Sequence, residues 1–223
     1  MKIGIISDAH GNAYGIRKCI GSLLSSEIER IFHLGDSVGY FPDVNGVLRE
    51  LNSAKAVYLM GNHEAMLLGR LKFDEARERD YRIAESRTRI SGENLAEMSR
   101  WLPFCEKTID GRRLLLVHGS PWDPLNGYVY PNSDLSIFGN LDFDAVFMGH
   151  THLPFVSHVN NVLVANAGSC GLPRDHGNLL SWLVYDTDRS VCEIIRSELD
   201  VSEVIREYGT SINKVVIDCL MRK

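Results

Sequence analysis

The sequence predicts an α/β fold that begins with parallel strands and ends in antiparallel hairpins. Short runs rich in Ile, Val and Leu have the length of buried strands, and each ends in polar residues: 3–7, 30–34, 56–60, 114–117 and 145–148. Between the early runs, apolar residues recur three and four positions apart, at 16–24 and 44–51. This alternation of strand and helix is typical of βαβ units.

The segment 64–102 is long, charged and free of proline, and we expect two or three helices there. Charges of both signs alternate from Asp74 to Arg89, which favours a solvated helix face over a binding patch.

After Pro154 the pattern changes to short strands, with turn signals at 160–161 and 186–188 that indicate antiparallel hairpins. We expect a final helix to start near Asp200. Because no repeat, low-complexity tract or linker interrupts the chain, we expect one domain over residues 1–223.

Composition limits the possible partners. The 223 residues are 44% hydrophobic, but no apolar run approaches the roughly 18 residues that a membrane span needs. Since 24 Lys and Arg face 29 Asp and Glu, the net charge of −5 favours small substrates over long nucleic acid or anionic membranes. Five scattered cysteines without a C-x-x-C pair indicate a reducing compartment, and the short first apolar run resembles a strand more than a signal peptide. We therefore expect a cytoplasmic protein, whose oligomeric state stays open.

Polar clusters directly follow each of the five predicted strands. Reactive groups in α/β sheets gather beyond the carboxyl ends of the strands, so five separate loops can meet there. Seven side chains in these clusters can bind metal: Asp8, His10, Asp36, Asn62, His118, His150 and His152.

The types and spacing of these side chains indicate a pair of divalent ions. In an extended segment, residues two apart point to the same side, so Asp8 with His10, and His150 with His152, could each grip one ion. Carboxylate, imidazole and amide ligands without thiolate suit Mn²⁺, Fe²⁺, Co²⁺, Ni²⁺ or Zn²⁺. Two such ions need a bridging carboxylate, for which we predict Asp36, and can act on a shared water in a displacement at phosphorus.

The order Asp-x-His, Gly-Asp, Gly-Asn-His-Glu, His-Gly, Gly-His-Thr-His resembles the calcineurin-like metallophosphoesterases, most closely their small bacterial and archaeal phosphodiesterase branch. The resemblance implies a two-sheet β-sandwich of mixed sheets flanked by helices, in four αββα layers. It implies two metal sites, the first made of Asp8, His10, Asp36 and His152, and the second of Asp36, Asn62, His118 and His150. We expect Mn²⁺ in both. His63 matches the catalytic histidine of the family, next to the leaving oxygen.

Some positions depart from the family or allow two interpretations. Gly39-Tyr40-Phe41 replaces the Asp-Arg element of the serine/threonine protein phosphatases, which argues against that activity and leaves open what orients His63. Asn12 could contact substrate or cap the next helix. Arg174 could bind a substrate phosphate or make a structural contact.

The leading functional hypothesis is a dinuclear metal-dependent phosphodiesterase that acts on small, nucleotide-like phosphate esters. Within the enzyme class, the alternatives are an asymmetric dinucleoside polyphosphate hydrolase or a broad phosphomonoesterase. A retromer subunit resembles this fold while serving as a protein-interaction scaffold, but the completeness of the ligand set favours an enzyme.

Overall fold

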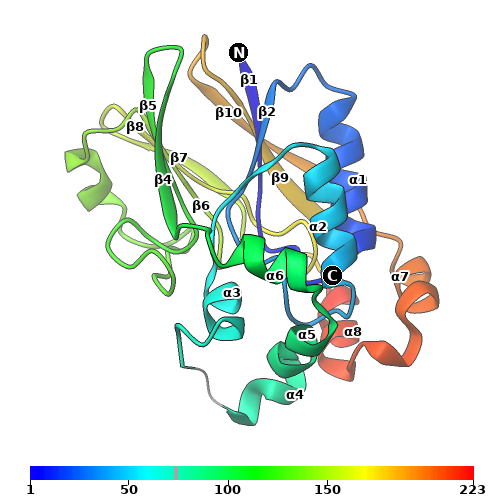
Figure 1. The fold of residues 1–223 in the computed structure, drawn as a ribbon. Helices are drawn as coiled ribbons and strands as arrows, with labels where there is room; N and C mark the ends of the chain where they lie inside the picture. Colours follow the sequence, from blue (N-terminus) through cyan, green and yellow to red (C-terminus); the bar gives the residue numbers. More distant parts are fainter. Residues whose placement is uncertain (73–74) are drawn as a thin grey trace.

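The computed structural model of the protein describes residues 1–72 and 75–223, and within them two mixed five-stranded sheets lie face to face (Figure 1). The first sheet has the order β10-β9-β1-β2-β3, with β1 Lys2–Ile6, β2 Arg30–His33, β3 Val57–Tyr58, β9 Leu179–Asp186 and β10 Val191–Glu198. The second has the order β4-β5-β6-β8-β7, with β4 Phe104–Ile109, β5 Arg112–Val117, β6 Ala145–Met148, β7 Phe155–Val159 and β8 Val162–Asn166. The predicted sandwich of mixed sheets flanked by helices is confirmed.

The predicted βαβ units form one side of the first sheet, from β1 to the edge strand β3. Strands β1, β2 and β3 are parallel, and the helices α1, Ala13–Leu24, and α2, Val44–Ser53, connect them and cover the outer face. The apolar stripe of α1 faces the sheet, but Leu24 at its end is 61% exposed. The strand expected over 56–60 is paired only at Val57 and Tyr58.

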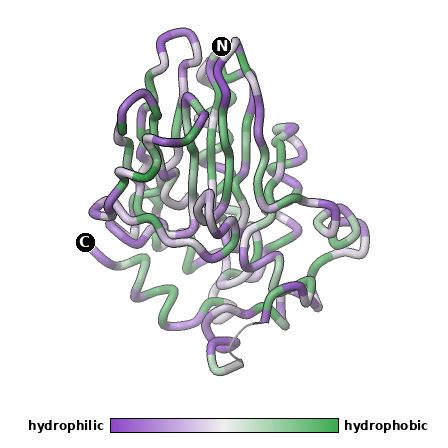
Figure 2. The backbone as a smooth tube through the Cα atoms, turned by 90° about the vertical axis from the view of Figure 1, so that its left-hand side faces the viewer, coloured by the Kyte–Doolittle hydropathy of each residue, from purple (hydrophilic) through white to green (hydrophobic). Residues whose placement is uncertain are grey.

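The core between the sheets consists of side chains from alternate strand positions. Ile5 and Phe32 of the first sheet and Leu116 and Phe147 of the second are fully or almost fully buried there. Hydrophobic residues lie along the central strands, whereas hydrophilic residues concentrate in the loops at the ends of the strands (Figure 2). This packing is the main source of rigidity under the loops that follow the strands.

The second sheet contains a strand that the sequence pattern did not indicate. Strand β4 alternates poorly and is mostly exposed, but it pairs with β5 along its whole length. The outer face of this sheet is covered by the segment 119–143, which contains the short 3₁₀ helix η2, Ser136–Asn140, with Phe138 buried.

The segment after β3 is divided into more and shorter helices than the two or three predicted. They are α3 Asn62–Leu67, the 3₁₀ helix η1 Glu75–Arg77, α4 Glu78–Tyr81, α5 Ile83–Arg89 and α6 Gly92–Met98. A left-handed residue, Arg82 with φ 56°, separates α4 from α5. Asp74, the first residue of the predicted charged run, lies outside the described residues.

The predicted hairpins and final helix are confirmed. Strands β7 and β8 turn at residues 160–161, and β9 and β10 are joined by residues 187–190. Asp200 caps α7, Val201–Tyr208, which is followed by the 3₁₀ helix η3, Gly209–Ser211, and by α8, Lys214–Leu220.

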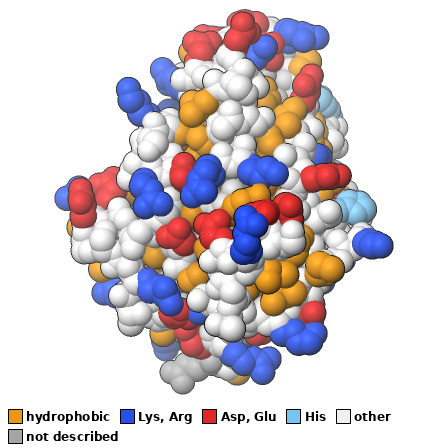
Figure 3. Space-filling view, turned by 90° about the vertical axis from the view of Figure 1, so that its right-hand side faces the viewer, with side chains coloured by type: hydrophobic (Ala, Val, Ile, Leu, Met, Phe, Trp, Pro, Cys, Tyr) orange, Lys and Arg blue, Asp and Glu red, His pale blue; other side chains and the backbone are white. Residues whose placement is uncertain are grey.

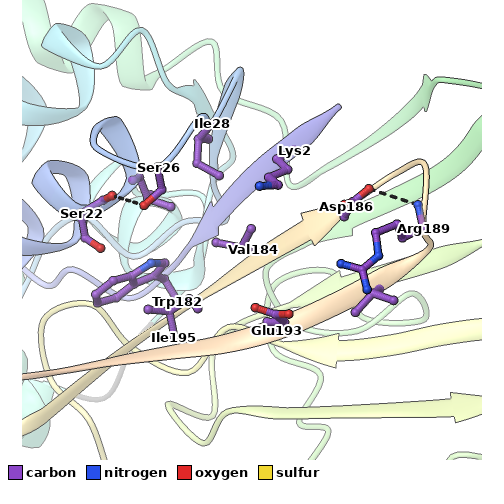
Figure 4. A pocket seen from close by; sticks show the side chains of 12 residues that line it. Lys2, Ser22, Ser26, Ile28, Trp182, Val184, Asp186, Arg189, Glu193 and Ile195 are labelled. Atoms are coloured by element: carbon purple, nitrogen blue, oxygen red, sulfur yellow. Dashed lines mark hydrogen bonds between the residues drawn. The ribbon is translucent and has the colours of Figure 1, made fainter.

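The surface over the helices carries Lys and Arg interspersed with Asp and Glu (Figure 3). Between α1 and strands β9 and β10, a cavity of about 260 Å³ hollows the outer face of the first sheet (Figure 4). Its lining combines apolar groups such as Trp182 with charges of both signs. Within the described part of the chain, no helix has the length and apolar character required to cross a membrane.

Candidate metal centre

The predicted ligands lie on loops beyond the carboxyl ends of β1, β2, β5 and β6 and in the first turn of α3. Five of them are in the left-handed backbone region, with φ between 51° and 67°: Asp8, His10, Asp36, His150 and His152. The expectation that the paired residues sit in extended segments is therefore wrong. This region costs about 1–2 kcal/mol for a residue with a side chain, so surrounding bonds must hold the loops in place.

Hydrogen bonds from neighbouring loops supply that support. Ser169 Oγ donates to the Asp8 carbonyl at 2.7 Å, and Asn166 Nδ2 donates to the Gly149 carbonyl at 2.6 Å. The His150 backbone N–H donates to Asp8 Oδ2 at 3.0 Å, which ties the loop after β6 to the loop after β1. The two bonds to Asp8 join the two sheets at the site.

One ligand group combines Asp8, His10 and His152, all of them buried. The Nε2 atoms of His10 and His152 lie 3.0 Å apart, and His152 Nε2 lies 3.2 Å from Asp8 Oδ1. Asp8 Oδ1 has no hydrogen-bond partner among the described residues.

The second group combines Asp36, His118 and His150, and Asn62 adds an amide oxygen. His118 Nε2 lies 3.1 Å from His150 Nδ1 and 3.0 Å from Asn62 Oδ1. His150 and His152 therefore belong to different groups, contrary to the idea that this pair grips one ion. This division agrees with the ligand sets that the family resemblance implies.

The Asp36 carboxylate lies between the two groups. Its Oδ2 is 3.5 Å from His118 Nε2 and 3.7 Å from His10 Nε2. Although burial opposes ionisation, the neighbouring imidazoles hold the pKa of Asp36 well below its usual range. Burial alone would lower the pKa of His118, but the carboxylates of Asp36 and Asp8 raise it to about 9.

The chemistry of the donors fits divalent cations. Nδ1 of His10 lies 3.1 Å from the Val38 carbonyl, and Nδ1 of His118 lies 3.1 Å from the Leu34 carbonyl. Because a carbonyl only accepts, each Nδ1 must carry a hydrogen, which leaves Nε2 as the ring nitrogen that can bind a cation. Imidazole nitrogens that face one another and a buried carboxylate oxygen without a partner are features that bound cations would satisfy.

His63 packs against aromatic rings at the rim of the cluster. Its ring stacks on Tyr40 at 5.4 Å and contacts Tyr81 of α4 at 4.8 Å, and no described residue hydrogen-bonds its buried Nδ1. A Cβ at Gly39, whose φ is +91°, would lie 2.4 Å from that nitrogen. Tyrosine packing and a required glycine thus orient His63, where the protein phosphatases use an aspartate.

Glu64 is a supporting residue that the sequence analysis did not single out. It is fully buried, its Oε2 accepts from the backbone N–H groups of Asp36 and Gly61 at 2.8 Å, and its Oε1 accepts from both donors of Ser37. Burial and the Asp36 charge raise the pKa of Glu64, while these hydrogen bonds oppose the rise. A glutamate three residues after the N-cap Gly61 is the half of a capping box that could have identified it; glycine has no side chain to form the other half.

Of the ambiguous residues, Asn12 caps α1, with Oδ1 accepting from the Gly15 N–H at 2.9 Å. Arg174 lies beside the cluster, where its Nη2 donates to the Tyr40 hydroxyl at 3.2 Å. His33 is packed inside its strand, and burial lowers its pKa to about 4.

Replacing Glu64 by Gln should loosen the centre, because an amide NH₂ group would face backbone donors. We expect a loss of about 1–3 kcal/mol in the free energy of unfolding and metal binding about 10–100-fold weaker. Denaturant titration and equilibrium dialysis measure the two effects. Glu50→Gln, at a surface ion pair with Arg17, is the matched control and should change neither. Native metal affinity in Glu64→Gln would contradict the supporting role.

Comparison with known proteins identifies the family. A protein of unassigned function from Methanocaldococcus jannaschii is 29% identical over 220 residues, 90% of this chain and 89% of that protein. A phosphodiesterase from the same organism is 29% identical over 172 residues, 76% of this chain and 84% of its own. The crystal structure of a metallophosphoesterase from Sphaerobacter thermophilus matches with a TM-score of 0.80 and 25% identity, covering 99% of this chain and 98% of its own. The model of the calcineurin-like phosphoesterase superfamily domain matches residues 1–190, and the chain therefore belongs to that superfamily.

Proposed function

We propose that the protein hydrolyses phosphodiester bonds in small, nucleotide-like substrates with the help of two divalent ions. The observation that carries this proposal is the buried cluster in which imidazole nitrogens face one another around the Asp36 carboxylate. In this proposal the two groups, joined by Asp36 and completed by Asn62, hold one ion each. Similarity to a protein named as a phosphodiesterase supports a diester substrate.

The chemistry of the site follows from its donors. When bound, two divalent ions activate water and neutralise the charge that builds on phosphoryl oxygens. The mixed nitrogen and oxygen ligands suit Mn²⁺ best in our proposal, with Fe, Co, Ni and Zn as alternatives. The carbonyls of Val38 and Leu34 keep two of the imidazoles in the ligating tautomer.

In this proposal His63 protonates the leaving oxygen. Its Nε2 lies 3.9 Å from Asp36 Oδ2, and a nitrogen of its ring converges with donor atoms of His10 and Asp36, so His63 lies next to both ligand groups. Burial lowers the pKa of His63 to about 3, although the Asp36 carboxylate opposes the shift. Divalent ions at the cluster would lower the pKa of His63 further, and the negative charge of a bound substrate phosphate would oppose that shift.

Removal and return of metal test the proposed function. Protein stripped by a chelator should lose hydrolysis of bis-p-nitrophenyl phosphate and regain it with Mn²⁺, Co²⁺ or Ni²⁺, but not with Ca²⁺, which prefers all-oxygen ligands. The reloaded protein is then assayed with cyclic nucleotides, dinucleoside polyphosphates and monoesters. Full activity after chelation, or faster turnover of monoesters than of every diester, would contradict the proposal.

His63→Ala should have an effect that depends on the leaving group. A nucleoside alkoxide leaves poorly without a proton, so its diester should react about 10²–10⁴-fold more slowly. The p-nitrophenolate anion needs little help, so the same variant should slow bis-p-nitrophenyl phosphate far less. Both rates and the bound metal are measured, with exposed His158→Ala as the control. Equal slowing of both substrates, accompanied by loss of metal, would indicate a structural role for His63.

A further inference from the structure

A cavity of about 170 Å³ opens beside the metal centre, between the loop 171–174 and α8. Tyr40 lines it, so the cavity adjoins the ring that stacks on His63. Arg174 and Arg222 also line it, together with apolar groups such as Leu172 and Val215, and none of its lining residues is a carboxylate. By contrast, the cavity in Figure 4 is lined by Lys2, Arg189, Asp186 and Glu193, whose charges balance.

Arg174 is fixed next to the ligands by contacts at both ends. Its backbone N–H donates to the His152 carbonyl at 3.4 Å, and its guanidinium donates to the Tyr40 hydroxyl at 3.2 Å. The Tyr40 ring in turn meets the edge of His10 at 4.8 Å. Arg174 is thus attached to two of the loops that carry ligands.

The guanidinium of Arg174 is half-buried without a carboxylate partner. Within the described part of the chain, no carboxylate oxygen forms an ion pair with it, and one hydrogen bond leaves most of its five N–H donors available. Asp8 is the carboxylate whose charge acts on it most strongly. Divalent ions at the cluster would neutralise the charge of Asp8. Arg174 would then have no counter-ion unless an anion binds.

Arg222 faces the same space from the segment after α8. Its Nη1 donates to the Arg174 carbonyl at 3.1 Å, and its own carbonyl accepts from the Gly177 N–H at 2.9 Å. Burial raises the pKa of Cys219 in the wall of the cavity, and the charges of both arginines oppose the rise. The two guanidinium groups therefore act on one shared volume.

We propose that this cavity is an anion-binding subsite, in which Arg174 binds an oxygen of the reacting phosphate and Arg222 binds a second anionic group of the substrate. The inference rests on the proposed function and narrows its substrates to phosphate esters that carry a neighbouring phosphate or carboxylate. Guanidinium groups suit this task because their planar donors match phosphate oxygens. Arg174 is here a substrate-binding residue, and Tyr40 positions it.

Calorimetric titration of the Mn²⁺-loaded protein with inorganic phosphate and with pyrophosphate tests the subsite independently of turnover. The native protein should bind pyrophosphate more tightly than phosphate. Arg174→Gln should weaken both by about tenfold to a hundredfold, because a charge-assisted contact is lost. Arg222→Gln should weaken the binding of pyrophosphate more than the binding of phosphate. The control Arg100→Gln, at a side chain that is 76% exposed just after α6, should change the affinity for neither anion.

Metal content and melting temperature are measured for every variant. Native affinities in both Arg174→Gln and Arg222→Gln, with metal retained, would overturn the subsite. If Arg174→Gln loses metal or fails to fold, Arg222→Gln still decides, because Arg222 is exposed and contacts no ligand. If the protein hydrolyses diesters but neither arginine variant changes anion binding, the subsite is refuted and the proposed function stands. Anion binding as expected without hydrolysis of any ester would refute the function and leave the subsite.

Discussion

The buried carboxylate of Asp36 is the constraint on which the site depends. It lies between imidazoles from the loops after β1 and β5 and from α3, and its backbone N–H donates to Glu64 of α3. An isolated carboxylate in such a place would be costly, so the surrounding charges must be arranged to keep it ionised. The same arrangement brings imidazole nitrogens within 3.0 and 3.1 Å of one another, as bound cations would require. The folded protein thus contains a buried set of donor atoms that bound cations would complete.

The strain in the ligand loops follows from the same requirement. Left-handed residues direct side chains from both sheets toward one point, and the hydrogen bonds of Ser169 and Asn166 hold those loops in place. Beneath them, the apolar core between the sheets provides a rigid base. The free energy gained by burying the core therefore offsets the backbone strain of the polar site at its edge.

The sequence predicted the parallel strands, their helices and the seven donors, because buried apolar runs and polar residues after them are local patterns. The spacing of the residues could not predict which histidine joins which group, since that depends on left-handed turns at His150 and His152. The family resemblance did imply this division. Strand β4 escaped prediction because it pairs at an edge with little apolar alternation. The packing of Tyr40 and Tyr81 on His63, like the cavity beside Arg174, arises from contacts distant in sequence.

The most direct test of this account is the number of metal ions bound per chain in native protein and in Asp36→Asn, measured by elemental analysis after equilibrium dialysis. Asp36 lies between both ligand groups, and a neutral amide is a poor bridge between two cations. The account predicts two ions per native chain and the loss of both together in the variant. A single ion in the native protein, or one ion retained by Asp36→Asn with native affinity, would contradict it.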